Sequence, residues 1–507
     1  MTIHLSIVLW LPLAAGVLAL LVRGSLARWI SVLGALATLA YAIVIVADYD
    51  VGGGLQHVTD EMWIGALGIH YKLAVSGLSV VLILTTAVVF LGAALWSALR
   101  GEPGSRPGLY AVLMGLAQSG VLGAFMAQDI VLFVAFFDLM LVPYYFLTIV
   151  WGGPRRGPAV LKLFVYTLVG SLLMLVGAVA TGVLAKAGDG GATSFAISDL
   201  QQSLVSSGSQ KWIFLTFAIA FLVKMPAFPF HGWMPDGYTQ MPLAPLATFT
   251  ALLSKVAAYG FLVIALPLYP QGAIEFQMLM LTVALASILY GSAMAFTATN
   301  TRLVLGYSSV AQLGFIIVGI FALNERGGDG ALLQSVNHAL VAAPLMLVVA
   351  MLAARAGGSE DLRDMGGIAT RAPAFAAVFL VLTYALLAMP GSTNFIGEYL
   401  ILLGVFTSKI VVAFVAAVGV AGAAVYGLRL YIRAMHNRTG PAVGAREMTA
   451  REALVIVPLM LVVLALSLYP QFGLQRTEHA VKTSLVAVQD AAHDRGETLA
   501  AIGKEER

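Results

Sequence analysis

The sequence predicts an all-α integral membrane protein with about fourteen transmembrane helices. Three properties support this class: 60% of the 507 residues are hydrophobic, only 10% are charged, and the mean hydropathy is +0.93. Soluble domains are about 45–50% apolar and about 25% charged. Because charges are so scarce here, each ionisable residue inside an apolar run becomes a candidate for function.

Apolar windows of about 20 residues, the length that crosses a bilayer, define the expected helices. The first window follows no basic segment, so we expect a spanning helix there rather than a signal peptide. Numbered in chain order, the fourteen windows are residues 3–22, 29–47, 78–99, 108–127, 130–151, 161–186, 212–230, 244–268, 274–297, 303–323, 331–354, 373–407, 410–432 and 452–475.

Lysine and arginine residues predict the orientation of the chain. Loops after odd-numbered helices hold sixteen of them, whereas loops after even-numbered helices hold five. Short cytoplasmic loops are enriched in these residues. We therefore expect the odd-side loops in the cytoplasm and both termini on the extracytoplasmic side.

Helices 7 and 12 are interrupted inside their apolar windows. Helix 7 breaks at KMPAFPFHGWMP, and helix 12 breaks at LAMPGSTNFIGE. Proline removes a backbone donor and clashes with the preceding turn, and in lipid the freed carbonyls need partners from protein or water. We therefore expect both breaks to lie beside a hydrated cavity.

Each interrupted helix is the fourth in a run of five, which predicts two inverted five-helix repeats. An odd number of helices inverts the second copy, and broken helices at matching positions indicate a site near the bilayer midplane. The expected parts are residues 1–100 with helices 1–3, 108–268 with the first repeat, 274–432 with the second repeat, 452–475 with helix 14, and an extramembrane tail, 476–507, that forms a surface helix or a frayed end.

The composition argues against a redox centre or a metal site in this chain. There is no cysteine, which excludes iron–sulfur ligation by thiolates, CxxC redox chemistry and disulfides. The sequence also has no GxxxxGK[ST], HExxH or GxSxG motif. The net charge of +3 is spread through loops and gives no nucleic-acid signal. We expect no cofactor and no metal ligand.

Ionisable residues inside the apolar runs are the candidate functional residues. Placing such a group at the bilayer centre costs several kcal/mol, so those retained are functional candidates by default. They are predicted to transfer protons, and they are Asp138, Lys224, Lys255, His338 and Glu398, with His231 at the break of helix 7.

Each candidate also has a structural interpretation. A lone lysine can extend its ammonium to the membrane surface. Asp138 and Glu398 can form static ion pairs that hold helices together, His338 can be a hydrogen-bonded core residue, and His231 can cap the broken helix. In the functional interpretation, Asp138 pairs with Lys224, because a nearby carboxylate favours the charged form of a buried lysine.

Several segments resemble the antiporter-like membrane subunits of respiratory complex I, the proton-translocating NADH–quinone oxidoreductase. They are FLVKMPAFPFHGWMPDGYTQMP, followed by LLSKVAAYGF, GYSSVAQLGF, NHAL, LRDMGGIATRAP and LAMPGSTNFIGEYLILLGVF, in the order that the family has them. The resemblance covers nearly the whole chain. It implies a proton-translocating subunit in a bacterial inner membrane that works with other membrane-arm subunits and has no NADH, quinone, flavin or cluster site of its own.

The resemblance also assigns roles to single residues. In the functional interpretation, Lys224, Lys255, His338 and Glu398 form a lateral relay across the middle of the membrane. The resemblance implies that Glu398 is the terminal residue, which faces the next antiporter-like chain. Asp138 stands where the family usually has glutamate, so a pair with Lys224 needs a closer helix approach or a bridging water. Gln312 stands where the family often has histidine, and glutamine cannot change protonation.

Two other functions remain open at this stage. The first keeps the fold and places the chain in a multisubunit cation/proton antiporter or a membrane-bound hydrogenase. The second is a structural membrane anchor whose buried charges are static ion pairs.

Overall fold

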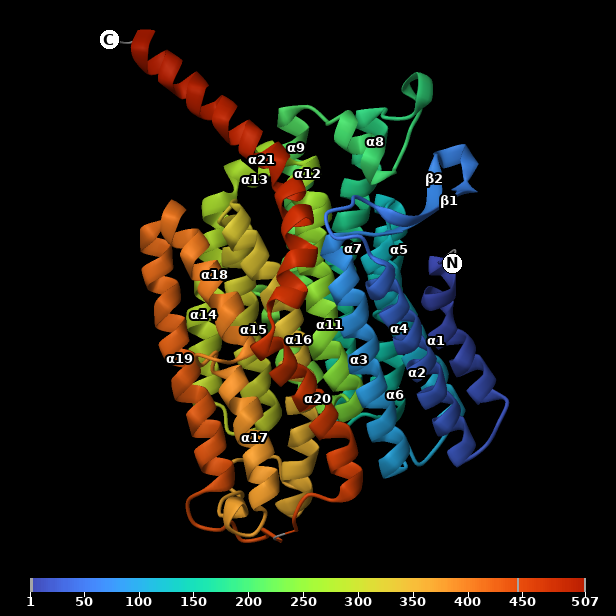
Figure 1. The fold of residues 1–507 in the computed structure, drawn as a ribbon, viewed down its shortest axis with the longest axis vertical. Coiled ribbons are helices and arrows are strands. Elements are labelled where there is room, and N and C mark those ends of the chain that lie inside the picture. The colour runs from blue at the N-terminus through green and yellow to red at the C-terminus, as the bar shows by residue number, and fades with distance from the viewer. Residues whose placement is uncertain (1–2, 445, 506–507) are drawn as a thin grey trace.

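The computed structural model describes residues 3–444 and 446–505, which form a bundle of helices running mostly along its long axis (Figure 1). In this part of the chain, eleven helices are long and apolar enough to cross a membrane. The helices are α1 (Leu5–Leu20), α2 (Ser25–Asp48), α3 (Gly77–Arg100), α4 (Pro107–Met126), α5 (Ile130–Leu139), α6 (Val142–Trp151), α7 (Arg156–Ala185), α8 (Ile197–Gln202), α9 (Ser207–Lys224), η3 (Phe230–Trp233), α10 (Met234–Gln240), α11 (Leu243–Gly260), η4 (Phe261–Ala265), α12 (Leu266–Leu268), α13 (Pro270–Glu275), α14 (Gln277–Thr297), α15 (Thr301–Phe321), α16 (Glu325–Arg355), α17 (Pro373–Leu386), α18 (Thr393–Ser408), α19 (Ile410–Met435), α20 (Ala450–Leu468) and α21 (Gln471–Glu505).

The helical membrane fold that the composition predicts is confirmed. The eleven long helices do not include α1 or the broken pairs α9/α10 and α17/α18, which occupy the places of predicted helices 1, 7 and 12. The count of fourteen crossings stays a prediction.

The break in helix 7 is satisfied by side chains of the protein. The helix α9 ends at Lys224, six residues before the end of the predicted window, and the chain resumes in the short 3-10 helix η3. The indole nitrogen of Trp233 donates to the carbonyl of Val223 at 3.0 Å, and the amide of Phe228 donates to Ser287 Oγ at 2.9 Å. The protein therefore supplies partners for backbone groups that lipid cannot bind.

The break in helix 12 is built in the same way. The helix α17 ends at Leu386 and α18 begins at Thr393. The hydroxyl of Tyr384 donates to the carbonyl of Pro390 at 2.6 Å, and Asn337 Nδ2 donates to the carbonyl of Thr393 at 2.7 Å. The sequence pattern therefore predicted both interruptions correctly.

A third interruption, in helix 5, was not predicted. The amide of Leu141 bonds to the carbonyl of Asp138 at 3.0 Å, which is a 3-10 contact, so the carbonyl of Phe137 loses its usual helical donor. Pro143, at the start of α6, cannot donate either. The interruption is therefore a local 3-10 turn between α5 and α6, directly beside a candidate site residue, and the two helices still run on as one apolar span, Ile130–Trp151.

Helix 14 and the tail also differ from the prediction. The helix α20 ends at Leu468, inside the predicted window, and α21 begins at Gln471. The side chains of Val481, Leu485 and Val488 on α21 are fully buried. A Cβ added at Gly328 of α16 would meet Val481 at 2.6 Å, so α21 lies directly on the bundle. The first part of the expected tail is a packed helix rather than a frayed end.

A β-hairpin covers one end of the bundle and was not predicted. Its antiparallel strands are β1 (Gln56–Ile64) and β2 (Ile69–Val75), drawn near the top of Figure 1. The amide of Gln128 donates to the carbonyl of Lys72 at 2.8 Å, and the amide of His70 donates to Asp129 Oδ2 at 3.0 Å. The hairpin is therefore fixed to the loop that joins α4 to α5.

Candidate functional site

Lys224 lies at the C-terminal end of α9 and is 3% exposed. Its Nζ donates to the carbonyl of Phe137 at 3.0 Å and lies 4.1 Å from the centre of the Phe137 ring. This carbonyl is the one that the break in helix 5 frees. Carbonyls at the C-terminal end of a helix carry partial negative charge and stabilise a nearby cation. Lys224 is therefore held by the broken end of α5.

Asp138 does not form the direct contact with Lys224 that the sequence suggested. Among the described residues, no nitrogen–oxygen pair of these two side chains lies within 4.0 Å. Asp138 instead lines a hollow of about 510 Å³ with Ser171 and apolar side chains of α6 and α7. The lining residues Phe146 and Leu161 are 46% and 62% exposed, so the hollow opens on the outside of the chain.

Lys255 and His338 form the central contact of the site. Lys255 is fully buried on α11, and its Nζ lies 2.7 Å from Nδ1 of His338 on α16. The same ammonium reaches the carbonyl of Thr250 at 3.1 Å and Ser254 Oγ at 3.2 Å. A proton can pass directly between two nitrogens at this separation.

Glu398, on α18, is 2% exposed and is held by two glutamines. Gln312 Nε2 on α15 donates to Glu398 Oε1 at 2.7 Å, and Gln334 Nε2 on α16 donates to Gln312 Oε1 at 2.7 Å. Amide oxygen and nitrogen positions are assigned from the hydrogen-bond network, and in this orientation each glutamine donates to an oxygen of the next group.

The helix α16 joins the two groups into one axis. Gln334 and His338 are four residues apart, so their side chains are neighbours on one face of this helix. The resulting line runs from Lys255 to His338, Gln334, Gln312 and Glu398. We call these five residues the central axis.

Several buried polar atoms along the central axis have no hydrogen-bond partner in the described part of the chain. Buried polar groups left in this way are typically bonded by ordered water. The atoms are His338 Nε2, Gln334 Oε1, Asn337 Oδ1, Glu398 Oε2, both side-chain atoms of Asn394, and the hydroxyls of Thr393 and Tyr426. No hydrogen bond joins the side chains of His338 and Gln334 in the described residues, but each of them has an unpaired polar atom that water can bind.

His231 lies apart from the central axis. It is on η3, where its ring centre is 4.7 Å from that of Tyr290 and 5.7 Å from that of Phe228. Its Nδ1 is buried and unpaired among the residues that the structure covers. Neither Lys224 nor His231 shares a hydrogen bond with Lys255 within the described residues. The six predicted residues thus form three clusters that no direct hydrogen bond joins among the described residues, and a relay between them through water stays a prediction.

Gln334 is the functional candidate that the sequence analysis missed. Glutamine is uncharged, and in the segment ALLQSVNHAL the ionisable residue is His338. The available signal was its spacing, since a polar residue four positions before a buried histidine shares its helix face.

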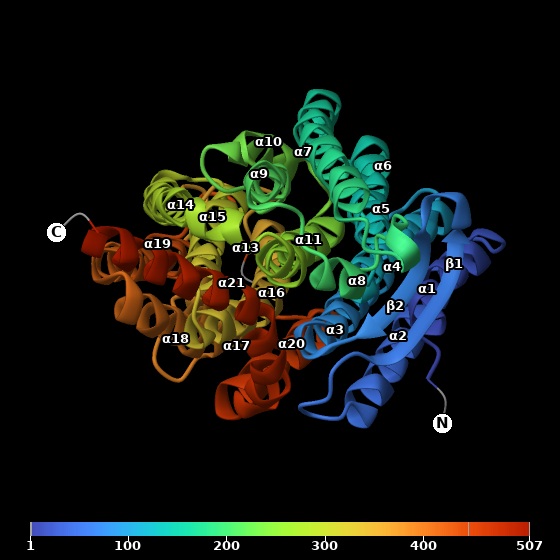
Figure 2. The same ribbon diagram turned by 90° about the horizontal axis from the view of Figure 1, so that it is seen from above.

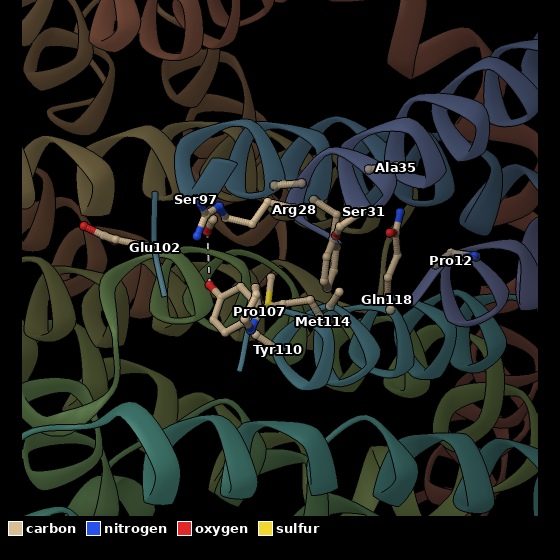
Figure 3. Close-up of a pocket in the computed structure, with 14 residues that line it drawn as sticks. Pro12, Arg28, Ser31, Ala35, Ser97, Glu102, Pro107, Tyr110, Met114 and Gln118 are labelled. Atoms are coloured by element: carbon tan, nitrogen blue, oxygen red, sulfur yellow. Dashed lines mark hydrogen bonds between the residues drawn. The ribbon is translucent and has the colours of Figure 1, made fainter. Parts of the chain in front are cut away.

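A small cavity between α1, α2, α3 and α4 lies outside the central axis (Figure 3). It holds about 20 Å³, enough for about one water. Ser97 Oγ and the hydroxyl of Tyr110 lie 3.1 Å apart at its wall, and Arg28 donates to the carbonyl of Gly101 at 3.1 Å. It is too small for an organic ligand. In the described residues, no group of three or more His, Asp or Glu side chains is placed to hold a metal.

Buried ionisable groups on several helices beside two broken helices define a membrane protein of the ion-translocating, antiporter-like class. The chain belongs to the NADH:quinone oxidoreductase/Mrp antiporter membrane family, which matches residues 127–423. That range contains all six predicted site residues.

Individual relatives agree over nearly the whole length. The chain is 35% identical to NADH-quinone oxidoreductase subunit M of Rhodobacter capsulatus, over 92% of this chain and 93% of that protein. It is 34% identical to the subunit M of Escherichia coli K12, over 84% of both. Within the family, the similarity is therefore to M-type subunits.

Solved structures show the same fold. A chain of respiratory complex I from Thermus thermophilus with bound NADH superposes with a TM-score of 0.86 and 28% identity, covering 95% of this chain and all of that one. A chain of the Mrp complex from Dietzia has a TM-score of 0.83 at 21% identity, covering 96% of this chain and all of that one, which shows the shared fold alone.

Proposed function

We propose that this chain is a proton-translocating membrane subunit of NADH–quinone oxidoreductase. Protons move along its central axis in response to quinone reduction in partner subunits. The observation that carries the proposal is the buried line from Lys255 to Glu398, which crosses α11, α16, α15 and α18 with three hydrogen bonds of 2.7 Å. The similarity to subunit M of complex I supports the assembly in which it works.

The residues of the central axis have different roles in this proposal. Lys255 and His338 exchange a proton directly, and Glu398 accepts or releases one at the other end. Gln334 and Gln312 hold the geometry but keep their protons. A proton therefore passes the two amides through water bonded to the unpaired atoms beside them.

Lys224 supplies the proton to Lys255 through water, since no protein hydrogen bond joins the two lysines among the described residues. Its fixed acceptor, the carbonyl of Phe137, keeps the amine in place in both protonation states. Asp138, the residue after Phe137 at the end of α5, modulates this charge without direct contact. The aspartate is one methylene shorter than the glutamate that the family usually has, which fits the missing direct contact.

The chain is proposed to hold no flavin, iron–sulfur cluster, NADH or quinone, so electron transfer takes place in its partners. It lies in a bacterial inner membrane with both termini on the extracytoplasmic side. Neighbouring membrane-arm subunits contact the apolar faces of α7 and α19, which Figure 2 places at different sides of the bundle. Val176 on α7 and Val411 on α19 are 63% and 72% exposed, as lipid-facing or subunit-facing residues are.

The test is Glu398→Gln in the purified complex reconstituted in liposomes. The variant keeps the shape of the side chain and its hydrogen bond to Gln312, but it cannot release a proton at neutral pH. We expect fewer protons moved per NADH oxidised, with normal assembly. Glu275→Gln, which alters a surface carboxylate paired with Lys211, is the control and should pump normally.

Unchanged pumping by Glu398→Gln would contradict the proposal and favour the structural anchor with static buried groups. The driving reaction distinguishes a cation/proton antiporter from a subunit of NADH–quinone oxidoreductase. If sodium gradients drive proton movement without NADH and quinone, the chain serves a cation/proton antiporter instead.

A further inference from the structure

A basic hollow lies at the ends of three helices, away from the central axis. It measures about 510 Å³ and is lined by the C-terminal ends of α3 and α16 and the N-terminal end of α20. Small-molecule sites span about 300–1,000 Å³, so the hollow has the size of a ligand site. Its charged lining residues are four arginines and one glutamate: Arg100, Arg355, Arg446, Arg451 and Glu452.

Arg355 holds the wall of the hollow together through hydrogen bonds. It is 3% exposed and donates to both carboxylate oxygens of Glu452, at 3.2 and 2.9 Å. Its remaining donors reach the carbonyls of Arg446 and Glu447 at 2.7 and 3.1 Å. Arg355 is therefore fully satisfied, and it fixes the loop that presents the other arginines.

The charge of Arg446 and Arg451 is not compensated. Across the described residues, neither guanidinium has a carboxylate within 4.0 Å. Glu452 is occupied by Arg355, and Glu447 accepts instead from the amides of Ala374 and Phe375, both at 3.0 Å. Two positive side chains, both exposed, therefore surround an open space.

A separate apolar groove lies further along the same three helices. It holds about 300 Å³ and is lined on α3 by Val81, Thr85 and Val88, on α16 by Val336 and Leu340, and further by residues of α20 and its connection to α21. On α3, Val88 lies twelve residues before Arg100, about 18 Å along the helix. One leaflet contributes about half of the ~30 Å hydrocarbon core, so the near end of the groove, at Val88, lies at the depth of acyl-chain ends.

The side of the bundle that carries the hollow exposes large apolar side chains, as a lipid-facing surface does. Figure 2 shows α3 and α20 along one edge of the molecule. On α20, Leu454, Leu461 and Leu468 are 56%, 54% and 85% exposed. An occupant of the hollow is therefore reached from the bilayer.

We propose that the hollow binds the anionic headgroup of a glycerophospholipid, with Arg446 and Arg451 contacting its phosphate and one acyl chain following α3 toward the groove. Planar guanidinium groups bind phosphate oxygens in pairs. Basic pockets between transmembrane helices at the cytoplasmic surface are suited to such headgroups. The lipid links α20 to α3 and α16 at the membrane surface.

The test uses the purified complex in liposomes that contain a photoactivatable phosphatidylglycerol or, separately, a phosphatidylcholine with the same acyl label. We expect labelling of peptides from α3, α16 and α20 by the anionic lipid. The double variant Arg446→Gln/Arg451→Gln should lower this labelling about 30-fold, since each basic residue near a membrane contributes about 1 kcal/mol and the two together contribute about 2 kcal/mol. The matched control, Arg433→Gln/Arg438→Gln, removes two exposed arginines that do not line the hollow and should leave labelling unchanged.

Two results would overturn the proposal. One is equal labelling by both lipids, or by wild type and the double variant. The other comes from a photocrosslinking residue at Ala450, an exposed residue of the lining. If it links to a polypeptide of a partner subunit rather than to lipid, a protein occupies the hollow.

Discussion

At the residue scale, the site depends on uncharged side chains as much as on charged ones. The ionisable residues could be identified from sequence because a charge in an apolar run is conspicuous and costly. Gln334 and the freed carbonyl of Phe137 could not, because amides and backbone groups occur in every helix. Their importance follows only from the 2.7 and 3.0 Å contacts that the fold creates.

Gln334→Leu tests the uncharged part of the central axis. Leucine has a similar volume but leaves Gln312 Oε1 without its donor and removes the polar atom beside His338. If the proton-transfer barrier rises by about 1.4 kcal/mol, the rate falls about tenfold. We expect lower proton pumping with normal assembly, measured in liposomes. Gln202→Leu, at an exposed position of α8, is the control. Equal pumping by the two variants would show that proton transfer along the central axis does not need Gln334.

At the scale of single elements, sequence rules predicted the breaks that contain proline but not the others. The interruptions of helices 7 and 12 contain proline and glycine, which are visible in the sequence. Helix 5 breaks at Met140 and Leu141, residues that favour helix, so its interruption depends on packing. The hairpin was missed for a related reason. Its strands are stabilised by contacts to the loop before α5, which are distant in sequence.

Trp233→Phe tests how the break in helix 7 is stabilised. Phenylalanine keeps the aromatic packing against Phe249 but leaves the carbonyl of Val223 without a donor. A buried acceptor left unpaired costs about 1–3 kcal/mol. We expect a lower melting temperature of the purified complex. Trp212→Phe, where the side chain is 72% exposed, should change little. Equal melting temperatures would show that water already satisfies this carbonyl.

Asp60→Asn tests the hairpin and its pH dependence. Burial alone would raise the pKa of Asp60, but hydrogen bonds from His70 at 2.6 Å and Lys72 at 3.1 Å outweigh it and lower the pKa. A lowered pKa means that the contribution to stability is present above the unfolded value, about 3.9, and is lost as the pH falls through the folded value.

We therefore expect faster amide hydrogen exchange in residues 56–75 for Asp60→Asn at neutral pH. The difference from wild type should disappear in acid, where both side chains are neutral. Glu61→Gln, on the exposed neighbouring position of β1, is the control. A difference that persists in acid would show that the carboxylate charge is not the cause.

At the scale of the whole molecule, the hairpin and the arginine-rich loops lie at opposite ends (Figure 1). The hairpin caps the end where α4 leads into α5. The described residues of the loop between α19 and α20, which include Arg438, lie at the other end, and the loop between α16 and α17, which carries Arg363, contacts them through the hydrogen bond from the Gly367 amide to the His436 carbonyl. The positive-inside rule then gives an orientation for the bundle as a unit. Sequence could predict this asymmetry because it depends on loop composition and not on packing.

Single cysteines test this orientation, because the natural chain contains none and gives no background labelling. Ala66→Cys lies in the exposed turn of the hairpin, and Ala442→Cys lies in the exposed loop after α19. In right-side-out spheroplasts, a membrane-impermeant maleimide should label Ala66→Cys directly and Ala442→Cys only after permeabilisation. A permeant maleimide, which should label both variants, controls for burial within the complex. The reverse pattern would show that the chain has the opposite orientation in the membrane. The arginine-rich end would then lie outside, and the basic hollow would lie in the outer leaflet.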